Sequence, residues 1–152
     1  MLKTYFFSHD LKTVHGKRFE AMLFDIAFNK DGWTFSSNQQ DLCEGTDFFY
    51  RGQRFDLATG SGERKIDQLW GKQYFPYKLS DDYQIEIGIR IKNEFKEFKE
   101  PVVVLEFQEF YSENIAFEAL ETLVKEMPKV RFEAARLLDE YRISQKKSRQ
   151  KN

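Results

Sequence analysis

The sequence is poor in the residues that cross-link a chain or hold a structural metal. It contains one cysteine, Cys43, and two histidines, His9 and His15. A single cysteine excludes an internal disulfide, and these three side chains do not match the four-ligand sets of structural zinc sites. Apolar runs long enough to span a membrane are absent as well. The first ten residues turn polar too early for a secretory signal peptide, so we expect a cytoplasmic protein with no membrane partner.

Aromatic side chains, in contrast, are abundant. They make up 16% of the 152 residues and include 16 Phe. A chain of this length buries enough surface to fold without disulfides or metals. We therefore predict a single globular domain over residues 1–142, with a core built largely from large rings.

Basic residues are concentrated near the C-terminal end. The net charge is −1, from 24 basic and 25 acidic residues, yet the segment 142–152 contains bases and no acid: Arg142, Lys146, Lys147, Arg149 and Lys151. We interpret residues 143–152 as a basic, flexible tail. Such a segment binds phosphates through counterion release. It is equally typical of a solvated chain end, so both interpretations stay open.

The spacing of apolar residues predicts a helix, then strands, then more helix. From about residue 13 to residue 27 it follows a helical repeat, and residues 83–92 alternate as in a half-buried strand. Residues 102–107 resemble a strand buried on both faces. From Ser112 the pattern is helical, and Pro128 is expected either to kink one long helix or to start a new one. We therefore predict an α+β fold: a central mixed or antiparallel sheet of about four strands, an N-terminal helix and a long, Pro-interrupted C-terminal helical segment.

Residues 45–58 have the pattern of a β-hairpin with its turn at residues 51–52. Asp47 lies near the start of the first strand and Asp56 near the end of the second. Because antiparallel strands place the start of one beside the end of the other, the two carboxylates should meet at one end of the hairpin. With Glu20 on the upstream helix, they form a plausible cradle for a divalent metal and for phosphoryl chemistry.

This arrangement resembles the PD-(D/E)XK nuclease superfamily, in which a helix precedes a mixed sheet and the first hairpin carries metal-binding acids. The resemblance is carried by Glu20, by Asp47 in the run Gly-Thr-Asp-Phe and by Asp56 in the run Arg-Phe-Asp-Leu-Ala. It implies a restriction-endonuclease-like fold in which Glu20, Asp47 and Asp56 hold magnesium or manganese. The implied function is that of a metal-dependent DNA endonuclease that hydrolyses phosphodiester bonds, from a mobile element or from a restriction or repair system.

One position departs from the pattern of that family. The family's lysine would follow Asp56 by two residues, where this chain has Ala58. An ammonium at that place stabilises the charge that develops on the phosphate, and alanine does not. Lys65, on the glycine-rich segment that follows, is our candidate to replace it. Without a replacement, the same architecture is a catalytically degenerate module that binds nucleic acid or a protein partner.

Further cations and aromatics suit contacts with DNA. At the end of the alternating strand, Arg90 and Asn93 are candidates for phosphate binding, together with four basic residues nearer the C-terminus: Arg142, Lys146, Lys147 and Arg149. A solvated strand edge also explains Arg90 and Asn93. The aromatic residues between 70 and 77 lie among lysines, which suits stacking on unpaired bases, but we favour a loop clamped to the core by its own rings.

Each of the three acids also has an ordinary structural interpretation. Glu20 stands one position off the apolar stripe of its helix, where a charged boundary residue is common. Asp47 and Asp56 suit turn or strand-terminal carboxylates that bond the local backbone. A third interpretation of the whole chain is a small-ligand-binding α+β domain, with the acids at the rim of an apolar cavity.

Overall fold

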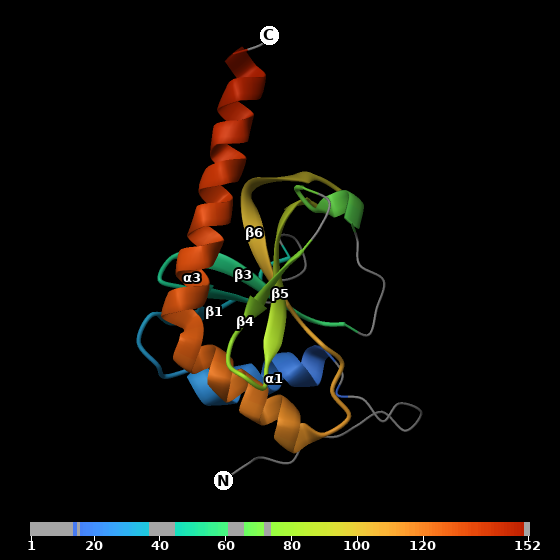
Figure 1. Ribbon diagram of the computed structural model, residues 1–152, viewed down its shortest axis with the longest axis vertical. Coiled ribbons are helices and arrows are strands. Elements are labelled where there is room, and N and C mark those ends of the chain that lie inside the picture. The colour runs from blue at the N-terminus through green and yellow to red at the C-terminus, as the bar shows by residue number, and fades with distance from the viewer. Residues whose placement is uncertain (1–13, 15, 37–44, 61–65, 72–73, 151–152) are drawn as a thin grey trace.

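The computed structural model describes residues 14, 16–36, 45–60, 66–71 and 74–150, except for the side chains of residues 149 and 150. Two helices and six strands make up the described fold (Figure 1), with one short 3-10 turn. In chain order the elements are α1 (Gly16–Ala27), β1 (Trp33–Phe35), β2 (Phe48–Tyr50), β3 (Gln53–Thr59), η1 (Ile66–Gln68), β4 (Phe75–Lys78), β5 (Gln84–Lys92), β6 (Glu97–Phe107) and α3 (Glu113–Gln150).

The sheet has the strand order β1-β2-β3-β6-β5-β4. Strands β3 and β6 run parallel and the other neighbouring pairs run antiparallel, so the sheet is mixed. The predicted α+β architecture, with a helix before the sheet and a long helix after it, is confirmed. The predicted number of about four strands is wrong, because the edge strands β1 and β4 have only three and four residues. Pro76 further weakens the strand pattern of β4, although an edge strand tolerates a proline.

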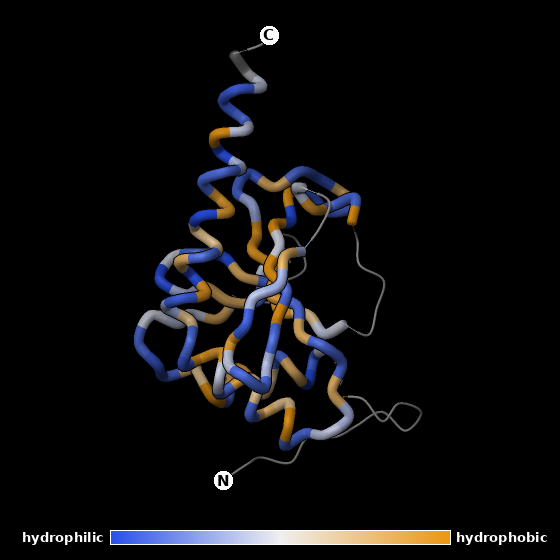
Figure 2. The backbone as a smooth tube through the Cα atoms, in the orientation of Figure 1, coloured by the Kyte–Doolittle hydropathy of each residue, from blue (hydrophilic) through white to orange (hydrophobic). Residues whose placement is uncertain are grey.

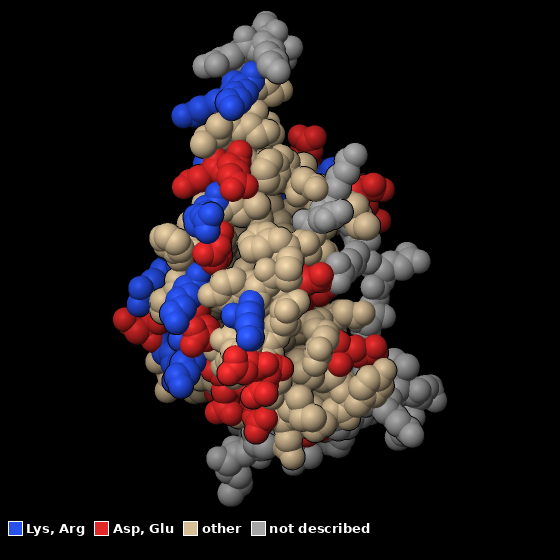
Figure 3. All heavy atoms as spheres, in the orientation of Figure 1, with Lys and Arg blue, Asp and Glu red and all other residues tan. Residues whose placement is uncertain are grey.

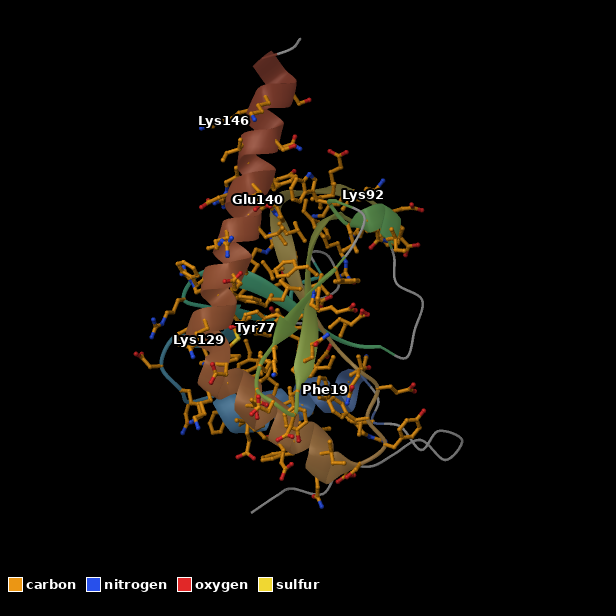
Figure 4. The ribbon with its side chains drawn as sticks, in the orientation of Figure 1. Phe19, Tyr77, Lys92, Lys129, Glu140 and Lys146 are labelled. Carbon is orange, nitrogen blue, oxygen red and sulfur yellow. The ribbon has the colours of Figure 1, made fainter. Side chains whose placement is uncertain are left out.

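Both helices pack against one face of the sheet. Buried residues of α1 and α3 share one apolar cluster with alternate residues of the central strands, such as Leu57, Ile87 and Leu105. Phe19 of α1 (Figure 4) contacts Phe107 edge to face, with 5.1 Å between the ring centroids. In Figure 2 the hydrophobic colour gathers on the strands and on the helical segments beside them, whereas the projecting end of α3 is mostly hydrophilic. The core therefore lies between the helices and this face.

The long helix α3 continues through Pro128 instead of ending there. Figure 1 shows a change of direction along α3, as expected where proline lacks a donor and its ring displaces the carbonyl four residues earlier. The basic segment that we interpreted as a tail continues this helix as far as Gln150 and projects beyond the sheet. Although α3 is long, no helix among the described residues is apolar enough to cross a bilayer.

A smaller apolar cluster covers part of the opposite face. Leu69 and Tyr74 pack there against Val104 and Ala58. The ring of Tyr74 lies so close to Gly88 that a Cβ at position 88 would be 2.6 Å from its Cδ1, so this strand position requires glycine. Tyr74 therefore packs on the sheet, as we favoured from the sequence, whereas Phe75 and Tyr77, which we assigned to the same loop, belong to β4.

Candidate functional site

The hairpin that carries both aspartates forms as predicted. Strands β2 and β3 pair antiparallel, with Phe48 opposite Phe55. Arg51 and Gly52 join them with φ angles of 47° and 82°, the left-handed pair that a two-residue turn of matching twist requires. From α3, Arg131 Nη2 donates a hydrogen bond of 3.1 Å to the carbonyl of Arg51, which ties the turn to the helix.

Asp47 lies just before β2 and bonds the backbone of β3 twice. Its N–H donates to the carbonyl of Phe55 at 2.9 Å. Its Oδ2 accepts a hydrogen bond from the N–H of Leu57 at 2.7 Å. The carboxylate thus satisfies a backbone donor at the point where the regular pairing of the two strands stops. This contact matches the structural interpretation of Asp47, and it also fixes the direction of the carboxylate.

The carboxyl groups of Asp47 and Asp56 meet. Their contact raises the pKa of Asp47, because a hydrogen bond between two carboxyl groups requires a proton. Asp56 also forms an ion pair with Arg90, whose Nη1 lies 2.7 Å from Asp56 Oδ2. The side chains of Asp56 and Arg90 are only 15% and 19% exposed, so water screens this pair weakly. The predicted meeting of the two aspartates at one end of the hairpin is therefore confirmed.

The pKa of Asp47 is raised from 3.8 to about 12. Burial is the main cause, because it disfavours the charged form. The hydrogen bond with Asp56, the charge of Asp56 and the charge of Glu20 raise it further, and the N–H of Leu57 opposes them. Asp47 therefore holds a proton at neutral pH, and Glu20 lies near enough to act on it.

A pocket of about 350 Å³ opens beside Asp47. Its lining includes three ionisable side chains, Lys17, Glu20 and Asp47. The rest is mostly apolar, with Ala21, Leu23, Phe24, Phe35, Phe48 and Leu57. Lys17 and Glu20 are three residues apart on α1, which places them on the same side of that helix. The Oγ of Ser36, also at this pocket, is buried and makes no hydrogen bond with the described residues.

The three predicted metal ligands are thus linked through Asp47, but they do not form a ready metal cage. Asp47 and Glu20 line the pocket, whereas Asp56 touches Asp47 and turns to Arg90. Within the part of the chain that the structure describes, no set of three or more His, Cys, Asp or Glu side chains has the arrangement of a metal site.

Ala58, which stands where the family has its lysine, is packed among other side chains. Ala58 lies opposite Glu106 of β6 and packs with the small apolar cluster of Leu69, Tyr74 and Val104. Lys65 lies outside the described residues. The sequence did offer a cation that we overlooked, since Lys17 precedes Glu20 by one helical turn and lines the same pocket.

The predicted phosphate-binding residues lie in two places. Arg90 is paired with Asp56, and the Oδ1 of Asn93 accepts hydrogen bonds of 2.8 Å from the N–H groups of Phe95 and Lys96 within a turn. Arg90 and Asn93 still line a common pocket of about 210 Å³.

The C-terminal cations are on α3. Arg142 Nη1 lies 3.7 Å from Asp139 Oδ1, and Lys146 and Lys147 are exposed. Figure 4 shows Lys146 near the projecting end of the helix, and Figure 3 shows basic side chains gathered there. Arg149 continues this end of α3, and its side chain lies outside the described part.

Comparisons with protein-family models, with curated protein sequences and with solved structures find no match to this chain. Its function is therefore inferred from the residues around Asp47 and from the chemistry that they allow.

Proposed function

We propose that the protein is a metal-dependent nuclease that hydrolyses phosphodiester bonds in DNA, built on a restriction-endonuclease-like domain. The observation that carries the proposal is the contact of the Asp47 and Asp56 carboxyl groups beside Glu20. The order of a helix with Glu20 followed by a hairpin with both aspartates is that of the PD-(D/E)XK superfamily. A mobile element or a restriction or repair system remains the expected source of such a domain.

Two ionised carboxyl groups that the fold holds against each other would repel, and a positive charge between them offsets that repulsion. Asp47 is held by the N–H of Leu57 and Asp56 by Arg90, so neither relaxes freely away from the other. A proton fills the need in the metal-free protein, and a divalent cation fills it better when the carboxylates ionise. Magnesium typically uses only one or two protein carboxylates and completes its shell with water and phosphate oxygens. The donor set of this site fits magnesium or manganese on that basis.

In the proposed reaction, Asp47 and Asp56 would hold the metal, and Glu20, which lines the same pocket as Asp47, would act on the attacking water. A metal bound there would lower the pKa of that water and neutralise charge on the phosphate. Lys17 lies at the same pocket and would stabilise the phosphate anion as it gains charge. This role was assigned to Lys65 from the sequence. Arg90 positions Asp56 and does not itself touch the substrate.

The decisive experiment replaces Asp47 by asparagine. The amide introduced by Asp47→Asn still offers an oxygen to the N–H of Leu57, so the variant should fold while losing the carboxyl group that would ionise to hold the metal. We expect no detectable Mg²⁺- or Mn²⁺-dependent cleavage of plasmid DNA, and no Mn²⁺ binding by isothermal titration calorimetry.

The matched control is Asp82→Asn, since Asp82 is an exposed acid on the turn before β5. It should retain wild-type cleavage and Mn²⁺ binding. Cleavage that persists in Asp47→Asn, or a wild-type protein that cleaves with no divalent metal at all, would sink the catalytic proposal.

A second candidate function follows from the ion pair of Asp56 with Arg90. This pair and the hydrogen bond to Leu57 already give both aspartates structural partners, and Ala58 lacks the family's ammonium. A module that binds DNA without cleaving it would have these features. The projecting end of α3, with Lys146 and Lys147, is then the expected phosphate contact.

The double variant Lys146→Gln/Lys147→Gln tests this second function. If both lysines contact phosphates, the salt dependence of DNA affinity, measured by fluorescence anisotropy, should become shallower by about 1.8 in its logarithmic slope. An unchanged slope would remove these lysines from the interface.

A further inference from the structure

An unusual aromatic surface borders the pocket beside Asp47, which we call the acidic pocket because Glu20 and Asp47 line it. Phe24 is 47% exposed and Phe28 is 56% exposed, and their rings stack with 5.5 Å between centroids and 21° between planes. Phe35 of β1 meets Phe24 edge to face at 4.9 Å. Phe24 and Phe35 line the same pocket as Glu20 and Asp47. We call Phe24, Phe28 and Phe35 the aromatic wall.

The exposed rings of the aromatic wall lie off the side of α1 that packs on the sheet. The helix is anchored by its buried side, which carries Phe19, Met22, Leu23 and Ala27. Phe24 and Phe28 lie outside that side and present large apolar rings to solvent, a feature that marks binding surfaces. The wall is nevertheless rigid at its base, because Phe35 stacks on Trp33 and Trp33 stacks on Phe48 of the core.

The two kinds of lining residue match the two parts of a nucleotide. Lys17, Glu20 and Asp47 are ionisable and suit a phosphate with its metal, and Phe24 and Phe35 of the aromatic wall provide rings. Every base has a flat face that stacks on such rings, independent of sequence. In a duplex those faces are covered by the neighbouring base pairs, so only an unpaired base is available to stack on a protein ring.

We propose that Phe24, backed by Phe28 and Phe35, stacks on an unpaired base of single-stranded DNA whose phosphate enters the acidic pocket. This inference rests on the proposed function for the phosphate half of the pocket, and it names the substrate class as single-stranded or locally unpaired DNA. The aromatic wall selects strands with unpaired bases, and the ionisable residues of the acidic pocket receive the DNA phosphate.

The test compares binding of a fluorescein-labelled single strand with binding of the same strand in a duplex, by fluorescence anisotropy in Ca²⁺ to suppress cleavage. The wild type should bind the single strand more tightly. Phe24→Ala should weaken single-strand binding by roughly tenfold to a hundredfold, the loss of one stacked base, and should change duplex binding less. Phe24→Leu keeps an apolar side chain but removes the ring, so it should show most of the same loss.

Phe132→Ala is the matched control, because Phe132 is a 64% exposed Phe on α3 that does not border the acidic pocket. It should bind both DNA forms as the wild type does. The inference is overturned if Phe24→Ala binds the single strand normally or if Phe132→Ala loses as much affinity. It is also overturned if sedimentation shows a wild-type dimer that Phe24→Ala dissociates, since the wall would then be a contact between two copies.

The two proposals fail separately. Single-strand binding that depends on Phe24, without any metal-dependent cleavage, would support the aromatic wall and overturn the nuclease. Cleavage that depends on Asp47, with equal activity on duplex and single strand and no effect of Phe24→Ala, would do the reverse.

Discussion

The two faces of the central sheet differ in kind. The face under α1 and α3 is apolar at successive alternate positions, as Ile87 and Leu105 illustrate, and these side chains are fully buried. The opposite face of the same strands carries Asp56, Arg90 and Glu106, which are buried or largely buried although they are ionisable. Only a small apolar cluster covers that face among the described residues.

The apolar face under the helices stabilises the fold, whereas the opposite face holds ionisable side chains in fixed positions. Burial of apolar area stabilises the first face in proportion to the area removed from water. On the second face, each charge loses hydration and needs a partner in return, so Asp56 has Arg90 and also contacts Asp47. Titratable groups with perturbed environments cluster at functional sites, so this face is where the candidate site is sought.

The largest expected effect is on the apolar face. Phe107→Ala removes a ring that contacts both Phe19 and Phe110, and the surrounding elements cannot collapse into the space. We expect the free energy of unfolding to fall by about 3–5 kcal/mol in urea titrations. Phe132→Ala, which removes an exposed ring, should change it by less than about 0.5 kcal/mol. Equal losses in both variants would erase the distinction between covered and uncovered aromatic residues.

A smaller effect is expected from breaking the ion pair on the other face. Arg90→Gln leaves Asp56 without its guanidinium partner in a place that water reaches poorly, so the unfolding free energy should fall by roughly 1–3 kcal/mol. Adding Asp56→Asn removes the uncompensated charge and should restore part of the loss. If the double variant is as unstable as the sum of the single variants, the two side chains are not coupled.

Stability should also depend on pH through Asp47. Above pH 4 the unfolded chain releases this proton while the folded protein, with the pKa raised to about 12, keeps it. The folded state then binds one more proton, so its unfolding free energy should fall by ~1.4 kcal/mol per pH unit from this group as the pH rises. Urea titrations of the wild type and Asp47→Asn at several values from about pH 5 to about pH 8 would reveal how the unfolding free energy changes with pH. The variant should lack this contribution, and identical slopes would contradict the protonated pair.

The smallest effect on stability is expected at Lys17. Its side chain is exposed at the pocket, so Lys17→Met should change the unfolding free energy by less than about 0.5 kcal/mol. Plasmid cleavage should nevertheless fall on the order of 100-fold while Mn²⁺ binding stays unchanged, because the ammonium acts on the phosphate and not on the metal. Lys30→Met is the control, because Lys30 is an exposed lysine just after α1 that does not line this pocket. Normal cleavage by Lys17→Met would contradict the role of Lys17, and Lys65 would again be the candidate for the missing cation.

Elements with strong periodicity were predictable, and those with weak local signals were not. The helical repeat of α1 and the alternation of β5 emerge directly from residue spacing. Strand β4 was missed because four residues with a proline carry little pattern, and the pairing with β5 decides their conformation. For Pro128 the sequence left open a kink in one helix or the start of a second, and the packing of residues on both sides holds one continuous helix.

The candidate site was predictable only in part for the same reason. The turn at Arg51 and Gly52 is a local feature, and it brings Asp47 and Asp56 together. The partnership of Asp56 with Arg90 depends on β5 being placed beyond β6 in the sheet, a long-range arrangement that no local spacing reports. The shared pocket of Lys17, Glu20 and Asp47 depends likewise on how α1 packs against the hairpin.

The sequence by itself determined that this chain is an α+β protein with paired aspartates on a hairpin after a helix that carries Glu20, because periodicity and turn chemistry act over a few residues. Only the tertiary structure decided that Asp47 is buried against Asp56 with a raised pKa, that Arg90 pairs with Asp56, and that Lys17 and the aromatic wall border the same pocket. Burial and charge at a site are set by segments distant in the chain, and they exist only when those segments are packed together.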